Sequence, residues 1–146
     1  MDKKSTSIPI QLIPIEDDGY HIMIPARING MDANLLVDTG ASRTVFDNQN
    51  ISRFLPEVRE EFEKNDKLST GLGTNTLESF VTSIDELELG DLLVQNYQTV
   101  ILDLMHVNES YSKLELPIID GVLGSDLLKK FDAEIYYKKK IIKLFY

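Results

Sequence analysis

The sequence predicts a mainly β domain built from hairpins, with one or two short helices. Apolar residues alternate with polar ones along much of the chain, which is the pattern of half-buried strands. Turn-forming Gly and Asn residues separate these runs. The 146 residues fit one domain, which buries roughly two-thirds of its unfolded surface. We therefore expect a polar N-terminal tail at 1–7 and a single domain at 8–146.

Composition excludes several classes of function. Fifteen Lys and Arg against 24 Asp and Glu give a net charge of −9, which argues against nucleic-acid and membrane partners. The one cationic cluster, 138–140, is interpreted as a solvated hairpin turn. Cysteine is absent, which excludes cysteine proteases and thiolate metal sites. Prolines interrupt the apolar run at 8–15, so no signal peptide is predicted and we expect a cytoplasmic protein, provided that no leader was removed.

The first elements are expected to be strands. Residues 8–15 alternate well enough for an edge strand, where proline is tolerated because some backbone donors face solvent. Two further strands, 20–28 and 31–37, flank Asn29-Gly30. This dipeptide favours a tight two-residue hairpin turn because both of its positions need positive φ.

The middle of the chain changes character twice. Segment 48–66 is acidic with spaced apolar residues, and Pro56 suits the first turn of a short amphipathic helix over 57–64. The stretch Gly71-Leu72-Gly73 then predicts either an ordinary hairpin turn or a mobile flap. Strand-forming residues return in another hairpin over 80–84, 87–89 and 92–102, with its turn at Gly90-Asp91.

The C-terminal third mixes short elements. Segment 103–115 fits either a loop or one or two helical turns. An apolar run ends before Ser125, which is suited to cap a helix that continues to Phe131. Two strands are expected over 132–137 and 141–146, on either side of the lysine turn. The apolar residues of the last strand belong either to the core or to an interface, and we favour the core.

An apolar strand that ends in a single carboxylate is the most informative feature of the sequence. The run Leu35-Leu36-Val37 brings Asp38 to the rim of a predicted core, in a loop held by the sheet. Thr39 can both donate and accept hydrogen bonds, and Gly40 permits backbone angles that a side chain forbids. The alternative is an ordinary turn-forming aspartate. The combination of residue types favours a built site.

Three stretches, taken in order, resemble the retropepsin-like aspartic peptidases. The first is Asp38-Thr39-Gly40-Ala41 after an apolar strand, and the second is the glycine-bearing segment 71–73 in the place of the flap. The third is Val122-Leu123-Gly124 before a short helix. The resemblance covers about residues 22–146 and implies a closed β-barrel of hairpins. Segment 48–66 is longer than in the compact viral members of this family.

The resemblance implies an aspartic endopeptidase that uses no metal or other cofactor. Such chemistry needs two carboxyls, one to take a proton from water and one to protonate the substrate carbonyl. The chain holds one such motif and is too short for two lobes, so we expect a homodimer in which the Asp38 of each protomer meets the other. The partners are then a second copy and a peptide or protein substrate. The implied catalytic residues are Asp38, Thr39 and Gly40, and the implied substrate-binding residues are Ala41, Gly71, Leu72, Gly73, Val122 and Gly124, with Val45 as a further pocket wall.

Other functions have weaker support in the sequence. A hydrolase triad of Ser42 with His21 or His106 lacks the Gly-x-Ser-x-Gly elbow, and the histidines lack metal-binding spacing. A phosphate loop is excluded because Gly71-x-Gly73 has neither the third glycine nor the lysine. The remaining alternative is a retropepsin-like fold without catalysis, used for dimerisation or peptide binding.

Overall fold

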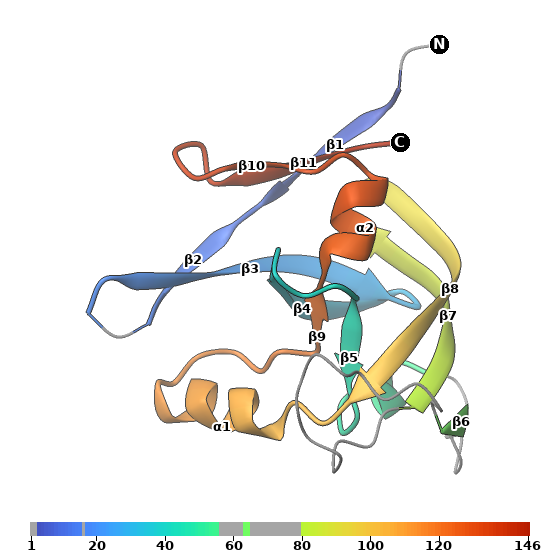
Figure 1. The fold of residues 1–146 in the computed structure, drawn as a ribbon, viewed down its shortest axis with the longest axis horizontal. Helices are drawn as coiled ribbons and strands as arrows, with labels where there is room; N and C mark the ends of the chain where they lie inside the picture. Colours follow the sequence, from blue (N-terminus) through green and yellow to red (C-terminus); the bar gives the residue numbers. More distant parts are fainter. Residues whose placement is uncertain (1–2, 16, 56–62, 65–79) are drawn as a thin grey trace.

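A closed β-barrel dominates the computed structural model, which describes residues 3–15, 17–55, 63–64 and 80–146. The sheet that contains it consists of β2 (Gln11–Ile15), β3 (Gly19–Ile28), β4 (Met31–Val37), β5 (Val45–Asp47), β6 (Glu63–Lys64), β7 (Phe80–Leu89), β8 (Leu92–Leu102) and β9 (Gly121–Leu123). Six of these strands follow the order β3-β4-β9-β5-β8-β7, and pairing of β3 with β7 closes the barrel (Figure 1). The predicted mainly β barrel is confirmed.

Tight turns connect the predicted hairpins. Asn29 and Gly30 have φ values of 51° and 81°, and they join β3 to β4 with Ile28 opposite Met31. Gly90, with φ of 62°, joins β7 to β8 in the same way. Both turns need positive φ angles, which glycine and asparagine adopt most easily. These residue types therefore predicted the positions of the two turns.

A second, three-stranded sheet lies above the barrel in Figure 1 and contains both ends of the described chain. It has the order β1 (Ser5–Pro9), β11 (Ile141–Phe145), β10 (Glu134–Tyr136). The single strand expected over 8–15 is therefore wrong. The chain changes sheets at Ile10, whose N–H donates to the Lys140 carbonyl at 2.9 Å. Ile142 and Leu144 of β11 are buried, which confirms that the last strand belongs to the core.

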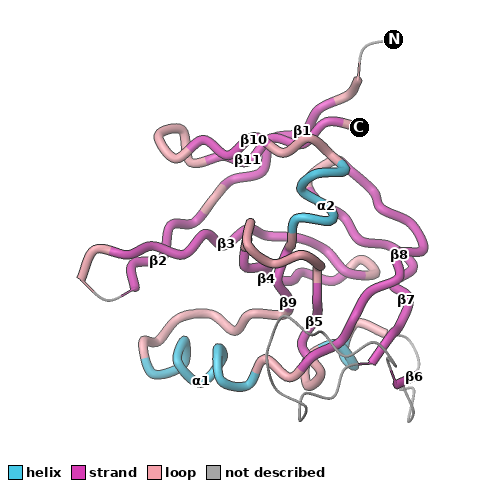
Figure 2. The backbone as a smooth tube through the Cα atoms, in the orientation of Figure 1, coloured by secondary structure: helices cyan, strands magenta, loops and turns pink. Residues whose placement is uncertain are grey.

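Two α-helices and one 3₁₀ turn lie among the described residues: α1 (Met105–Lys113), α2 (Ser125–Lys130) and η1 (Ile51–Arg53). Figure 2 shows α1 and α2 in cyan. The predicted cap of α2 is wrong, because Gly124 holds the N-cap position and no side chain caps it. Of the helix expected over 57–64, residues 57–62 lie outside the described residues. Its last two residues form β6 instead, because they pair with β7.

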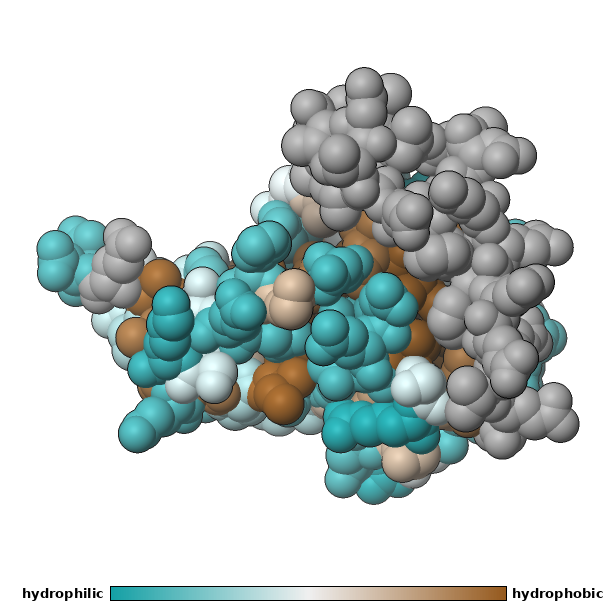
Figure 3. Space-filling model, turned by 90° about the horizontal axis from the view of Figure 1, so that it is seen from below, coloured by the Kyte–Doolittle hydropathy of each residue, from teal (hydrophilic) through white to brown (hydrophobic). Residues whose placement is uncertain are grey.

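Most buried apolar side chains form one core inside the barrel and beneath α2, and a smaller cluster lies near α1. The smaller cluster consists of Ile13, Met23, Tyr111 and Ile119. Seen from below, hydrophilic side chains cover much of the described surface, with apolar areas between them (Figure 3). Neither helix of the described part has the length and apolar character needed to span a bilayer.

Candidate active site

Asp38 follows directly after β4, and its side chain is exposed. The preceding Val37 is buried, so the strand is anchored in the core up to the residue before the carboxylate. The Gly40 N–H donates to Asp38 Oδ1 at 2.9 Å, and the Ala41 N–H donates to the Asp38 carbonyl at 3.1 Å. A Cβ atom on Gly40 would lie 3.3 Å from Oδ1, so glycine allows the backbone to come close to the carboxyl. This turn presents the carboxyl to solvent.

The barrel strand β9, which lies between β4 and β5, supports the Asp38 loop. It pairs in parallel with β4 and antiparallel with β5. The Asp38 N–H donates to the Leu123 carbonyl at 3.0 Å, and the Ser125 N–H donates to the Ala41 carbonyl at 2.7 Å. At Gly124 a Cβ atom would lie only 2.5 Å from a backbone oxygen of this loop. Glycine is therefore required where β9 passes under the loop.

A partly buried polar network lies behind the loop, and it was not predicted from the sequence. Thr44 Oγ1 accepts the Gly124 N–H at 2.9 Å and donates to Asp126 Oδ1 at 2.8 Å. Tyr97 donates its O–H to Asp126 Oδ2 at 2.5 Å. Burial, and then this bond to the carboxylate, raise the pKa of Tyr97, so the phenol stays protonated and keeps donating. One feature of the sequence could have indicated this network: Asp126 lies in the first turn of the predicted helix, just after Val122-Leu123-Gly124.

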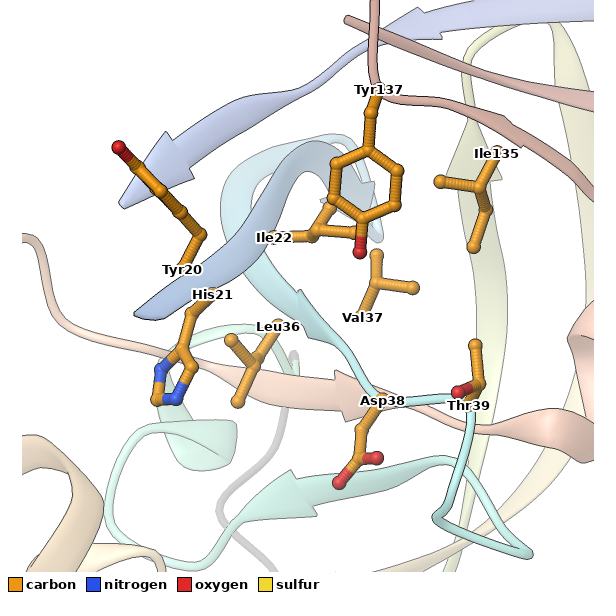
Figure 4. A pocket seen from close by; sticks show the side chains of 9 residues that line it. All are labelled: Tyr20, His21, Ile22, Leu36, Val37, Asp38, Thr39, Ile135 and Tyr137. Atoms are coloured by element: carbon orange, nitrogen blue, oxygen red, sulfur yellow. The ribbon is translucent and has the colours of Figure 1, made fainter. Parts of the chain in front are cut away.

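A pocket of about 250 Å³ opens beside Asp38. Its apolar side chains come from β3, β4 and β10, and Asp38 and His21 line it from either side of Leu36 (Figure 4). His21 Nδ1 lies 2.6 Å from the Tyr111 hydroxyl of α1. The β3–β4 pairing, with Ile22 opposite Val37, brings His21 toward Asp38. The predicted Asn29-Gly30 hairpin implies this register, but His21 was not predicted as a site residue. The lining residues are Tyr20, His21, Ile22, Leu36, Val37, Asp38, Thr39, Ile135 and Tyr137.

The predicted site residues fall into three groups. Asp38 and Thr39 line the pocket, and Gly40 lies next to them in the loop. Ala41 and Gly124 lie at the base of that loop, and Val122 pairs with Val45 across β9 and β5, away from the pocket lining. Gly71, Leu72 and Gly73 lie outside the described residues. Within the described ranges, no three metal-binding side chains come together.

The family model of aspartyl proteases matches residues 24–127, which include the Asp38 loop, β9 and most of the barrel. This chain belongs to the aspartyl protease family. No curated protein sequence matches it closely enough to serve as a relative.

Solved structures place this family member in the retropepsin-like fold. A retropepsin-like aspartic protease from Rickettsia conorii superposes with a TM-score of 0.61 at 18% identity, covering 100% of this chain and 95% of that one. The EIAV protease complexed with the inhibitor HBY-793 superposes with a TM-score of 0.54 at 18% identity, covering 85% of this chain and 99% of that one. The retroviral protease-like domain of Ddi1 from Leishmania major superposes with a TM-score of 0.52 at 17% identity, covering 86% of this chain and 94% of that one.

Proposed function

We propose that the protein is an aspartic endopeptidase whose active site is completed by a second copy of the chain. The observation that carries this proposal is the exposed Asp38 carboxyl, held by the Gly40 N–H at the rim of a pocket. Asp38 supplies the only carboxyl among the described residues that line this pocket. A two-fold homodimer brings a second Asp38 to the first and supplies the missing group.

In this arrangement two neighbouring carboxyls share one proton, since both cannot be ionised at low cost in energy. The ionised carboxyl takes a proton from water, and the water attacks the peptide carbonyl carbon. The protonated carboxyl donates to the carbonyl oxygen, and a proton passes to the amine as the C–N bond breaks. Thr39 and Gly40 keep the two carboxyls in place, and the glycine-bearing segment 71–73 closes over the extended peptide.

The variant Asp38→Asn tests this function. It keeps the shape of the side chain but removes the acid, so cleavage of a peptide library at mildly acidic pH should fall by about 100-fold or more. Sedimentation should show that the variant is still a dimer. The matched control is Asp32→Asn, at the start of the same strand, whose exposed carboxylate pairs with Arg27. That control should cleave normally.

Two results would overturn the proposal. A wild-type protein that is dimeric but inert on the library would be a silent dimerisation or peptide-binding module. A wild-type protein that is strictly monomeric at micromolar concentration would leave each aspartate without its partner.

A further inference from the structure

His21 and Asp38 line the same pocket, so His21 can contact a substrate that binds beside Asp38. The pocket floor is apolar, formed by Ile22, Leu36 and Val37. Figure 4 shows the His21 ring and the Asp38 carboxyl on opposite sides of Leu36. A substrate side chain that enters beside Asp38 belongs to the residue next to the scissile bond. Its stem would cross the apolar floor, and its end would reach toward the imidazole.

Tyr111 fixes the orientation of this imidazole. The two rings are stacked at 20°, with centroids 5.9 Å apart, and Nδ1 lies 2.6 Å from the phenol oxygen. Tyr111 is only 2% exposed and packs with Met23 and Ile119, so its position is set by the small core cluster. Burial raises the pKa of Tyr111, so its hydroxyl keeps its proton.

The hydrogen bond also decides which nitrogen of His21 faces the pocket as a donor. Within the described part of the chain, Nδ1 is the partner of the Tyr111 hydroxyl. A buried hydroxyl that donates to nothing costs about 1–3 kcal/mol, so the phenol donates to Nδ1. With Nδ1 engaged by the phenol, the imidazole carries an N–H on Nε2 in both its neutral and its charged form. The pocket therefore combines an apolar floor with one oriented N–H donor.

We infer that His21 makes this pocket a subsite for a side chain with an apolar stem and a hydrogen-bond acceptor at its end, with glutamine preferred. This inference rests on the proposed function. Glutamate offers the same acceptor, but its charge faces the Asp38 carboxyl in a chain of net charge −9. Methionine has nearly the shape of glutamine without the acceptor. Glutamine should therefore be cleaved faster than either glutamate or methionine.

The test uses three peptides that differ only at the residue next to the scissile bond, which is Gln, Glu or Met. For the wild type we expect the Gln/Met ratio of kcat/KM to be about 10, as one hydrogen bond implies. The His21→Phe variant keeps an aromatic ring without the donor, and its ratio should fall to about 1. The matched control is His106→Phe, an exposed histidine of α1 that does not line the pocket, and its ratio should not change.

A second variant covers the case in which His21→Phe fails to fold. Tyr111→Phe leaves His21 in place but removes the group that holds its proton on Nε2, so the Gln/Met ratio should fall by about twofold or more. A wild-type ratio near 1, or a ratio that neither variant changes, would overturn the inference.

Failure of catalysis can be separated from failure of this inference. If the wild type cleaves none of the peptides, the proposed function fails. The same Gln and Met peptides with a reduced, uncleavable bond then give a ratio of Kd by calorimetry. A ratio that favours Gln in the wild type and vanishes in His21→Phe supports the subsite, and equal Kd values contradict it.

Discussion

Thr44 shows how a single buried side chain holds the Asp38 loop. Its side chain is 1% exposed, and its one hydroxyl joins the backbone of Gly124 to the carboxylate of Asp126. Its carbonyl also accepts the Thr99 hydroxyl at 3.0 Å. The residue thus connects the Asp38 loop to β8, to the end of β9 and to α2.

Thr44→Val should destabilise the fold by about 1–3 kcal/mol, because the Gly124 N–H and the Asp126 carboxylate each lose a buried partner. Urea unfolding measures this change. The matched control is Thr82→Val. Thr82 is also buried, but its hydroxyl has no hydrogen-bond partner in the described structure, so its removal should keep or raise the free energy of unfolding. Equal losses in both variants would contradict the assigned role of Thr44.

Asp38 could be found from the sequence because its neighbours are local: an apolar strand before it and Thr39-Gly40 after it. Asp126 and Tyr97 could not be found in this way. Asp126 is 82 residues from Thr44 and 29 from Tyr97, so their bonds exist only once the barrel has closed. His21 was set aside because the sequence has no Gly-x-Ser-x-Gly elbow and its histidines lack metal-binding spacing. Its contact with Tyr111, 90 residues away, forms only in the folded chain.

Among the elements, β9 depends on a buried acid at its start. Asp120 is 1% exposed and accepts the Asn34 N–H and the Arg53 guanidinium, each at 2.8 Å. Burial raises the pKa of Asp120, the bonds to Asn34 and Arg53 oppose the rise, and the charge of Asp47 adds to it. The carboxyl therefore links β4, β9 and η1. Because its pKa is raised, keeping it ionised in the fold lowers the free energy of unfolding by an amount that depends on pH.

Asp120→Asn should reveal this cost as a difference in pH dependence. Because the folded pKa lies above the usual value of about 3.9, the unfolded chain loses its proton first as pH rises. The contribution of Asp120 to the free energy of unfolding is then complete below about pH 4 and declines through the folded pKa. Urea unfolding from about pH 4 to pH 7 should show the wild type losing stability relative to Asp120→Asn.

The variant Arg53→Met sharpens this measurement. Without the guanidinium, the pKa of Asp120 should rise further, and the decline with pH should become steeper. A wild type that gains stability relative to Asp120→Asn over the same range would show that the bonds of Asp120 outweigh its burial.

Elements with local signals were predicted well, and those set by distant pairing were not. Asn29-Gly30 and Gly90 predicted their hairpins because turn angles depend on the residues in the turn itself. The break between β1 and β2 at Ile10 has no such signal, because it follows from pairing with the C-terminal hairpin. Likewise, β6 is a strand because β7 is beside it.

At the scale of the whole molecule, the barrel places Asp38 at the rim of the pocket, where it is the only aspartate among the described lining residues. The strand β4 carries Asp38, β9 supports it, and the C-terminal hairpin lines the pocket through Ile135 and Tyr137. The chemistry of amide hydrolysis by carboxyls needs a second acid in a different protonation state. We therefore propose that Asp38 acts with the Asp38 of a second copy.

Mixing wild-type and Asp38→Asn chains tests this claim most directly. The two proteins are mixed at fixed total concentration, allowed to exchange subunits, and assayed for peptide cleavage. If each site needs two Asp38 carboxyls, mixed dimers are inactive, and an equal mixture keeps about one quarter of the wild-type activity. Activity that falls in proportion to the wild-type fraction, to about one half in an equal mixture, would show that each chain acts alone and would contradict the account.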